Sequence, residues 1–197
     1  MVKVNKSHLE QILRDTTKPI LVLDPREQDK YRPEALRDSV SYSIDSYCSA
    51  LRSSRSDGWS LTDDDKSKLK ELERVKSELD NSLKFEYART IEEVYEKLDK
   101  SDYAFVLTGI NAEELGVEAS KGFDTRRNFV EELARREQPF VINTELSAVN
   151  ALENMSKHHM CVTVDGPSNE NYGLSFVLGS YAKGEALPVN QTQINYK

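Results

Sequence analysis

The sequence predicts an α/β fold: a mostly parallel sheet of four to five strands, with helices on both faces and a helical hairpin inserted after the first strand. Short, almost continuous apolar runs alternate with amphipathic segments of helical period. This alternation is typical of parallel strands joined by helices. Within residues 26–88 the apolar side chains instead recur every three or four positions over two long blocks, as in paired helices.

The first strand is expected at residues 18–25, after a short helix at 6–15. Pro33 suits the first turn of the next helix, and Thr62 suits the N-cap of the helix after it. The first helix has an apolar stripe at Leu36, Val40, Ile44, Tyr47 and Leu51, and the second at Leu69, Leu72, Val75, Leu79 and Leu83. We expect the two helices to form an antiparallel hairpin.

The α/β pattern resumes at Thr90, which forms a capping-box pattern with Glu93. Further strands are expected at 103–109, 139–144 and 160–166, and residues 186–190 are a candidate fifth strand. Helices are expected at 91–98, 123–138, 147–159 and 173–184. The helix at 123–138 would be capped by Asp124 or Thr125 and would bury Phe129, Val130 and Leu133.

These elements divide the chain into three parts. Residues 1–25 and 89–190 form a Rossmann-like core, residues 26–88 the helical insertion, and residues 191–197 a flexible tail.

Composition limits the classes of partner. The chain has 27 basic and 34 acidic residues, so its net charge of −7 disfavours an extended nucleic-acid surface. No apolar run approaches the roughly 18 residues of a membrane span, and the N-terminus does not read as a signal peptide. The two cysteines lie far apart, which favours a reducing compartment. We therefore expect a soluble, cytoplasmic protein.

The motifs of several common enzyme classes are missing from the sequence. It has no Walker-type phosphate loop, no Gly-x-Gly-x-x-Gly and no Gly-x-Ser-x-Gly. His158, His159 and Cys161 do not make up the four ligands of a structural zinc. No cofactor and no metal are predicted.

Ligands of open parallel sheets bind at the carboxyl ends of the strands. This rule selects as ligand-binding candidates Asp24, Thr108, Asn143 and Asp165, together with Gly173 on the loop that follows. After the strand at 103–109, Glu118 is a candidate catalytic carboxylate, and Arg126 and Arg127 are candidate phosphate ligands. A solvated acidic loop followed by a helix with surface arginines is the alternative interpretation of that segment.

The segment from Asp165 to Val189 resembles part of the nucleoside 2-deoxyribosyltransferases and their Rossmann-like relatives. Those proteins have a strand ending in Asp-Gly, an acidic loop, and then Gly-Thr-x-Phe-Glu at the start of a helix. Here Asp165–Gly166 matches the strand end, and Gly173, Ser175, Phe176 and Gly179 fall in register. The nucleophilic glutamate of the family corresponds to Val177, which cannot form a covalent ribosyl intermediate. The resemblance implies a ligand that is held without cleavage, unless Glu118 is the working carboxylate.

Two functions follow as hypotheses. The first is binding, with or without processing, of a nucleotide or nucleoside-derived small molecule at the carboxyl edge of the sheet. The alternative is a non-enzymatic structural or interaction protein that oligomerises or binds a protein partner through helices 33–55 and 63–85. Whether the chain catalyses a reaction stays open.

Overall fold

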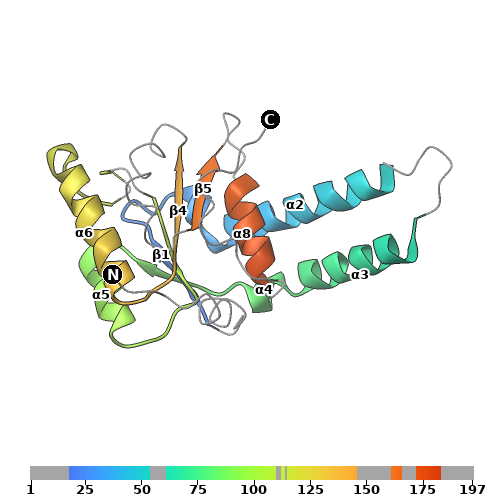
Figure 1. Cartoon of the computed structure of the whole chain (residues 1–197), viewed down its shortest axis with the longest axis horizontal. Helices are drawn as coiled ribbons and strands as arrows, with labels where there is room; N and C mark the ends of the chain where they lie inside the picture. The colour runs from blue at the N-terminus through green and yellow to red at the C-terminus, as the bar shows by residue number, and fades with distance from the viewer. Residues whose placement is uncertain are drawn as a thin grey trace.

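The computed structural model describes residues 18–53, 61–109, 112–113, 115–145, 161–165 and 172–182. These residues form one five-stranded, all-parallel sheet with strand order β2-β1-β3-β4-β5 (Figure 1). The strands are β1 (Ile20–Leu23), β2 (Phe85–Ala88), β3 (Val106–Thr108), β4 (Phe140–Glu145) and β5 (Cys161–Asp165). The predicted α/β class with a parallel sheet is confirmed.

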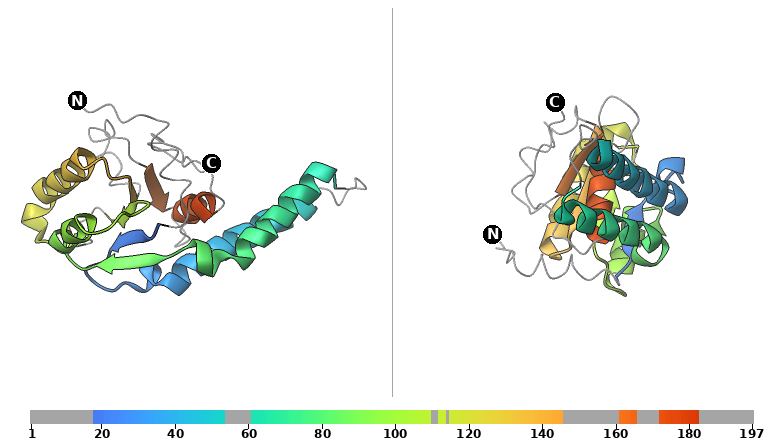
Figure 2. Two further views of the ribbon diagram at one scale, coloured as in Figure 1. Left: turned by 90° about the horizontal axis from the view of Figure 1, so that it is seen from below. Right: turned by 90° about the vertical axis from the view of Figure 1, so that its right-hand side faces the viewer.

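Helices cover both faces of the sheet. One face packs against α2 (Pro33–Ser53) and α8 (Tyr172–Ala182), and the other against α5 (Ile91–Leu98) and α6 (Gly122–Arg135) (Figures 1 and 2). Ile20 and Val22 point into the first layer, and Leu21 and Leu23 into the second. Because successive side chains of a strand point to opposite faces, a strand covered on both sides is apolar at every position.

The predicted helical hairpin is present and extends away from the sheet. Helices α2 and α3 (Asp63–Ser77) lie side by side, and the short helix α4 (Leu79–Ser82) leads back to the sheet (Figures 1 and 2). Thr62 caps α3 as predicted: its hydroxyl oxygen accepts from the backbone N–H of Asp65, whose carboxylate accepts in return from the N–H of Thr62. The second helix is not continuous to Leu83 as expected, because it breaks at Glu78.

The buried stripe of α2 differs from the prediction at two positions, since Tyr47 is exposed and Cys48, which was not predicted, is buried. Leu36, Val40, Ile44 and Cys48 are buried, whereas the side chain of Tyr47 is 52% exposed. Tyr47 lies on the same side of the helix as Leu36 and Val40, because seven and eleven residues both return to that side. Its exposure shows that the packing which covers this side near Val40 does not extend to Tyr47.

Strand β2 was not predicted, because residues 85–88 were assigned to the insertion. They pair in parallel with β1, with Ile20 opposite Phe85 and Leu23 opposite Ala88. Strand β2 is at the edge of the sheet, and Glu86 on it is exposed. Glu86 accepts a hydrogen bond from the hydroxyl of Tyr103 at 2.7 Å. A four-residue edge strand with a charged side chain lacks the continuous apolar run by which the central strands are recognised.

The start of α6 also corrects a prediction. A 3-10 turn, η2 (Ala119–Lys121), leads directly into Gly122, and Lys121 is the N-cap in place of Asp124 or Thr125. The expected inward residues Phe129, Val130 and Leu133 are all buried. The expected helices at 6–15 and 147–159, the candidate strand at 186–190 and the tail at 191–197 lie outside the described residues.

Two glycines should respond in opposite ways to an added methyl group. A Cβ at Gly179 would lie 3.8 Å from Cγ1 of Val40, an ordinary contact, whereas a Cβ at Gly122 would lie 2.7 Å from Cβ of Ala112. Gly179→Ala should stabilise the fold by up to about 1 kcal/mol, the helix-propensity difference between alanine and glycine. Gly122→Ala should destabilise it. Thermal melts of both variants test this, and a stabilised Gly122→Ala would contradict the close approach.

An ionic network joins α6 to α5. Glu132 accepts hydrogen bonds from Arg135 at 2.6 Å and Arg136 at 2.7 Å, and Arg136 also reaches Asp99 at 2.5 Å. The hydrogen bonds from Arg135 and Arg136 lower the pKa of Glu132 to about 2.

A carboxylate whose pKa is lower in the folded state stabilises the fold above its unfolded pKa, which is about 4.3 for glutamate. That stabilisation is lost as the pH falls toward 2. Glu132→Gln should therefore be less stable than the wild type at pH 7, and the difference should shrink between about pH 5 and pH 2. Denaturant titrations at several pH values measure it. A difference that does not change with pH would contradict the assignment.

Candidate functional site

Asp24 and Asn143 both lie at the carboxyl edge of the sheet, on the face covered by α2 and α8, at the ends of two strands that have β3 between them. Ile20 and Val22 face this layer along β1, so the alternation of the strand brings Asp24 to the same side. Val141 does the same for Asn143 on β4. Both polar side chains are buried: 5% of Asp24 and 1% of Asn143 is exposed.

Two tyrosines complete what we call the polar cluster: Asp24, Tyr31, Tyr87 and Asn143. Tyr31 is fully buried at the end of the 3-10 turn η1 (Asp29–Tyr31), which connects β1 to α2. The amide nitrogen of Asn143 donates to the hydroxyl of Tyr31 at 3.4 Å. The hydroxyl of Tyr87, on β2, donates to the carbonyl oxygen of Tyr31 at 2.6 Å.

Tyr87 remains protonated in this surrounding. Burial and, to a smaller extent, the nearby carboxylates of Asp24 and Glu34 raise its pKa to about 12, against an opposing effect of Arg37. The polar cluster therefore places a carboxylate near the neutral phenol of Tyr87. Sequence reasoning missed both tyrosines, since Tyr31 lies in a connection without periodicity and Tyr87 on the strand that was not recognised.

Asp24 is the unusual member of the cluster. Its backbone N–H donates to the carbonyl of Ala88 at 2.9 Å, which fixes the residue at the end of β1. Its Oδ1 is buried, and within the described part of the chain it has no hydrogen-bond partner. A buried polar atom without a partner costs about 1–3 kcal/mol, and more when it is charged. An acceptor that no described residue satisfies is where we look for a donor supplied by a ligand.

Thr108 ends β3 but does not join the polar cluster. Its neighbours in register are Leu23 and Ile142, which belong to the core on the α5 and α6 side. The hydroxyl of Thr108 donates to the carbonyl oxygen of Gly109 at 2.8 Å and is buried. The strand-end rule selected Thr108 by its position along the chain, but the pleat of the strand turns it to the opposite face.

Ionic contacts join the loops that follow β1, β2 and β3. Arg26 pairs with Glu113, and Arg89 with Glu27. Gly116 has a φ of +70° and lies so close to Pro25 that an added Cβ would be 3.0 Å from the proline Cβ. Three connections at the carboxyl edge are thereby linked to one another.

The candidate catalytic and phosphate residues lie on the surface of this loop region and of α6. Glu118 is exposed and pairs with Lys121 at 3.5 Å. Arg127 is also exposed and pairs with Glu131 at 2.9 Å, while the side chain of Arg126 lies outside the described residues. Among the described residues, the exposed Glu118 has neither the burial nor a like-charge contact of the kind that activates a carboxylate.

The segment that resembles the deoxyribosyltransferases is described only in part. Asp165 ends β5 opposite Glu145, and Gly173 is the second residue of α8, but their side-chain surroundings lie outside the described residues. The hydroxyl of Tyr181 donates to the carbonyl oxygen of Lys18, at the amino edge of the sheet, so α8 begins toward the carboxyl edge. Val177 is fully buried in the apolar core between α8 and the sheet. A core side chain thus occupies the position of the family's nucleophile.

Comparison of the chain with protein-family profiles, with curated proteins and with solved structures finds no match. The described residues include no group of three or more His, Cys, Asp or Glu side chains that could hold a metal ion. No helix in the described ranges is long and apolar enough to cross a membrane.

The Oδ1 atom of Asp24, which no described residue satisfies, should cost stability in the absence of ligand. Asp24→Asn keeps the shape of the side chain and removes the buried charge, so we expect it to raise the free energy of unfolding by about 1 kcal/mol. Denaturant titration of the ligand-free protein measures this. A clear loss of stability would show that the carboxylate is satisfied within the fold.

Proposed function

We propose that the protein binds a nucleotide or nucleoside-derived small molecule at the carboxyl edge of its sheet, on the side of α2 and α8. The observation that carries the proposal is the buried Oδ1 of Asp24 at the carboxyl end of β1, for which none of the described residues provides a hydrogen-bond partner. In doubly wound α/β folds, a carboxylate near a strand end commonly accepts hydrogen bonds from ribose hydroxyls. Asp24 would take this role, because a hydroxyl donor satisfies its free oxygen.

The polar cluster favours the sugar over the phosphate as the group it contacts. Its charged member is a carboxylate, and Glu34 adds a second negative charge near Tyr87. Arg26 and Arg89, on the adjacent loops, already pair with carboxylates. A phosphate placed on Asp24 would be repelled, whereas neutral hydroxyl groups would be accepted. Asp165, Gly173 and Arg126 remain candidates for contacts with other parts of the ligand.

The proposal is one of binding and does not include a cleavage step. Glu118 is exposed and paired with a lysine, and Val177 is an apolar core residue. Neither position offers a buried carboxylate that could attack or protonate a glycosidic bond.

A second function is favoured by a separate observation. The two large apolar side chains recorded as exposed in the described part of the chain, Tyr42 at 58% and Tyr47 at 52%, both lie on α2 in the hairpin. Aromatic side chains are enriched at protein interfaces. We propose that the hairpin is an association surface, which is compatible with a ligand site at the sheet edge.

A ligand panel tests the binding proposal. Nucleosides, nucleotides, NAD and sugar phosphates should be screened by thermal shift and then by calorimetry on the wild type, Asp24→Asn and Asp102→Asn. Asp102 is an exposed aspartate that pairs with Lys18, before β1 and therefore at the opposite edge of the sheet, so it provides a matched control.

We expect a nucleoside-containing compound to stabilise the wild type and the control, and its affinity for Asp24→Asn to fall about tenfold or more, as for a lost charged hydrogen bond. A flat panel on the wild type would refute the proposal. Equal affinity of all three proteins would refute the role of Asp24.

A further inference from the structure

The side chain of Tyr31 crosses the carboxyl ends of β1 and β3. The carbonyl oxygen of Tyr31 accepts from the hydroxyl of Tyr87, on β2, at 2.6 Å. Its own hydroxyl accepts from the amide of Asn143, on β4, at 3.4 Å. In the sheet, β1 and β3 lie between β2 and β4. Tyr31 therefore spans the strand end that carries Asp24, on the face covered by α2 and α8.

Gly109 lies between Asp24 and Asn143 at this edge of the sheet. The register of β1, β3 and β4 places the three residues at one level, one position beyond the last paired residues of β1 and β3. Leu107 packs in the layer of α2 and α8, so Gly109, two residues later, lies on the same side of the pleat. Glycine has no side chain, so it leaves an interval between the two polar side chains. Tyr31 reaches Asn143 from the β2 side and fits into this interval.

A ligand cannot reach the Oδ1 atom of Asp24 in this structure. The atom is buried, and only 5% of the residue is exposed. Tyr31, which spans the same strand end, is itself fully buried. Strand β1 cannot make room for a ligand, because all of its side chains are held in the core. Binding at Asp24 therefore requires a connecting segment at the carboxyl edge to move.

The connection Pro25–Arg32, between β1 and α2, is such a segment, and we call it the strap. Tyr31 is its one buried residue. Arg26 and Glu27 join the strap to neighbouring loops, but these ion pairs are formed by exposed side chains and contribute little. Glu27 also has a φ of +52°, in the left-handed region that non-glycine residues rarely adopt. Strained backbone of this kind is found at segments that switch between two arrangements.

We propose that the side chain of Tyr31 occupies the place of the ligand, and that the strap must open before a ligand reaches Asp24. When the strap opens, the amide of Asn143 loses the Tyr31 hydroxyl as its acceptor, and the carboxylate of Asp24 becomes accessible. A sugar hydroxyl can then donate to Asp24 while a sugar oxygen accepts from Asn143. The apparent affinity of such a site is the intrinsic affinity multiplied by the fraction of molecules whose strap is open. The inference rests on the proposed ligand site and adds what controls access to it.

The hydroxyl of Tyr87 holds the strap closed, so Tyr87→Phe tests the proposal. This substitution keeps the aromatic ring on β2 and removes the hydrogen bond to the carbonyl oxygen of Tyr31. Tyr103→Phe is the matched control. The hydroxyl of Tyr103 donates to Glu86, on the same strand β2, at 2.7 Å, but its ring packs on the opposite face of the sheet, away from the strap.

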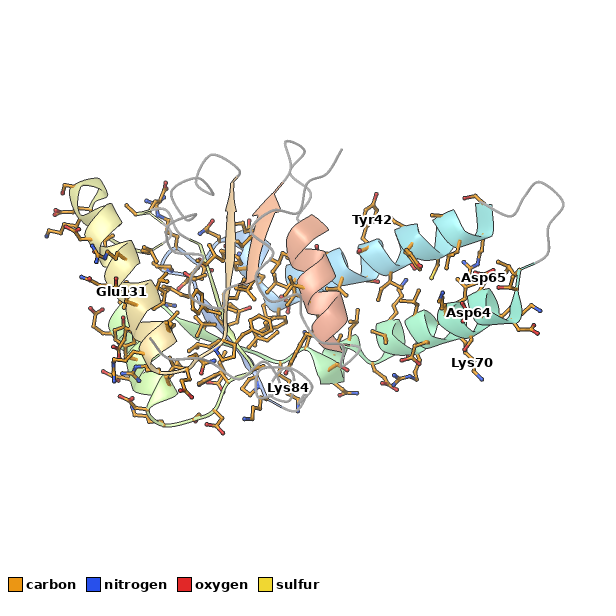
Figure 3. All side chains as sticks on the ribbon, in the orientation of Figure 1. Tyr42, Asp64, Asp65, Lys70, Lys84 and Glu131 are labelled. Atoms are coloured by element: carbon orange, nitrogen blue, oxygen red, sulfur yellow. The ribbon has the colours of Figure 1, made fainter. Side chains whose placement is uncertain are left out.

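Chemical labelling of carboxylates measures access to Asp24 without any ligand. The full-length wild type and both variants are treated with a water-soluble carbodiimide and glycinamide, and the labelled side chains are located by peptide mass spectrometry. Figure 3 shows two internal references that lie away from the strap. Asp65 is a buried aspartate at the far end of the hairpin, and Glu131 is exposed on α6. Hydrogen exchange of the same proteins measures opening of the strap at the backbone N–H of Tyr31, which donates to the carbonyl oxygen of Gln28 at 3.0 Å.

We expect Tyr87→Phe to increase the labelling rate of Asp24 by about three- to tenfold, as for the loss of one hydrogen bond. The N–H of Tyr31 should exchange faster by the same factor, while the amides of β1 keep their wild-type rates. Labelling of Asp65 and Glu131 should change less than about twofold in both variants, which shows that the fold is intact. In Tyr103→Phe, the labelling of Asp24 should equal that of the wild type.

Equal labelling of Asp24 in the wild type and Tyr87→Phe would overturn the proposal. So would labelling of Asp24 that follows the exchange of the β1 amides as denaturant is added, because the site would then open only by global unfolding. Adenosine is the probe for the ligand step, and its affinity should rise about three- to tenfold in Tyr87→Phe. Unchanged affinity with faster labelling would show that Tyr31 does not compete with the ligand. No binding of any panel compound, with labelling as expected, would refute the proposed nucleoside ligand and leave the opening of the strap established.

Discussion

Burial of β1 on both faces is the constraint on which the rest of the structure depends. Each side chain from Ile20 to Leu23 is at most 1% exposed, and the strand lies between β2 and β3. Full burial of such side chains stabilises a fold by about 1.5–3 kcal/mol each, provided that both faces are covered. Helices α2 and α8 therefore cover one face and α5 and α6 the other. The same alternation then turns the next residue, Asp24, toward the α2 layer.

What could be predicted from the sequence follows from the same constraint. The run at residues 18–25 is nearly continuous in apolar residues, so the sequence predicted the central strand. The apolar residues of α2 recur in steps of four, which predicted most of its buried stripe. The edge strand β2 has no such run, because one of its sides faces no other strand of the described sheet. Tyr47 fits the helical period as well as its neighbours do, and only the extent of the packing over α2 excludes it from the core.

In the candidate site, the position of a residue along the chain predicts that it lies at the end of a strand, but not which face of the sheet its side chain occupies. Strand-end residues can be found by counting along the chain, and Asp24 and Asn143 were found in this way. Which face they occupy depends on the pleat, so Thr108, an equally good candidate by position, lies on the other side. Tyr31 comes from a connection whose path no local pattern specifies, yet it contacts both Asn143 and Tyr87.

The carboxylates of Glu132 on α6 and of Asp24 at the sheet edge have opposite surroundings. Glu132 has its pKa lowered to about 2 by two arginines, which suits a structural ion pair and is the opposite of what a general acid needs. Asp24 is instead buried near Tyr87, with an oxygen that no described residue satisfies. A fold selected for stability alone would have an apolar or amide side chain at this position, because substitutions that stabilise a protein are easy to find. Local departures from good packing are expected where function requires them. The carboxyl edge at Asp24 is therefore the part of this molecule at which we propose a ligand.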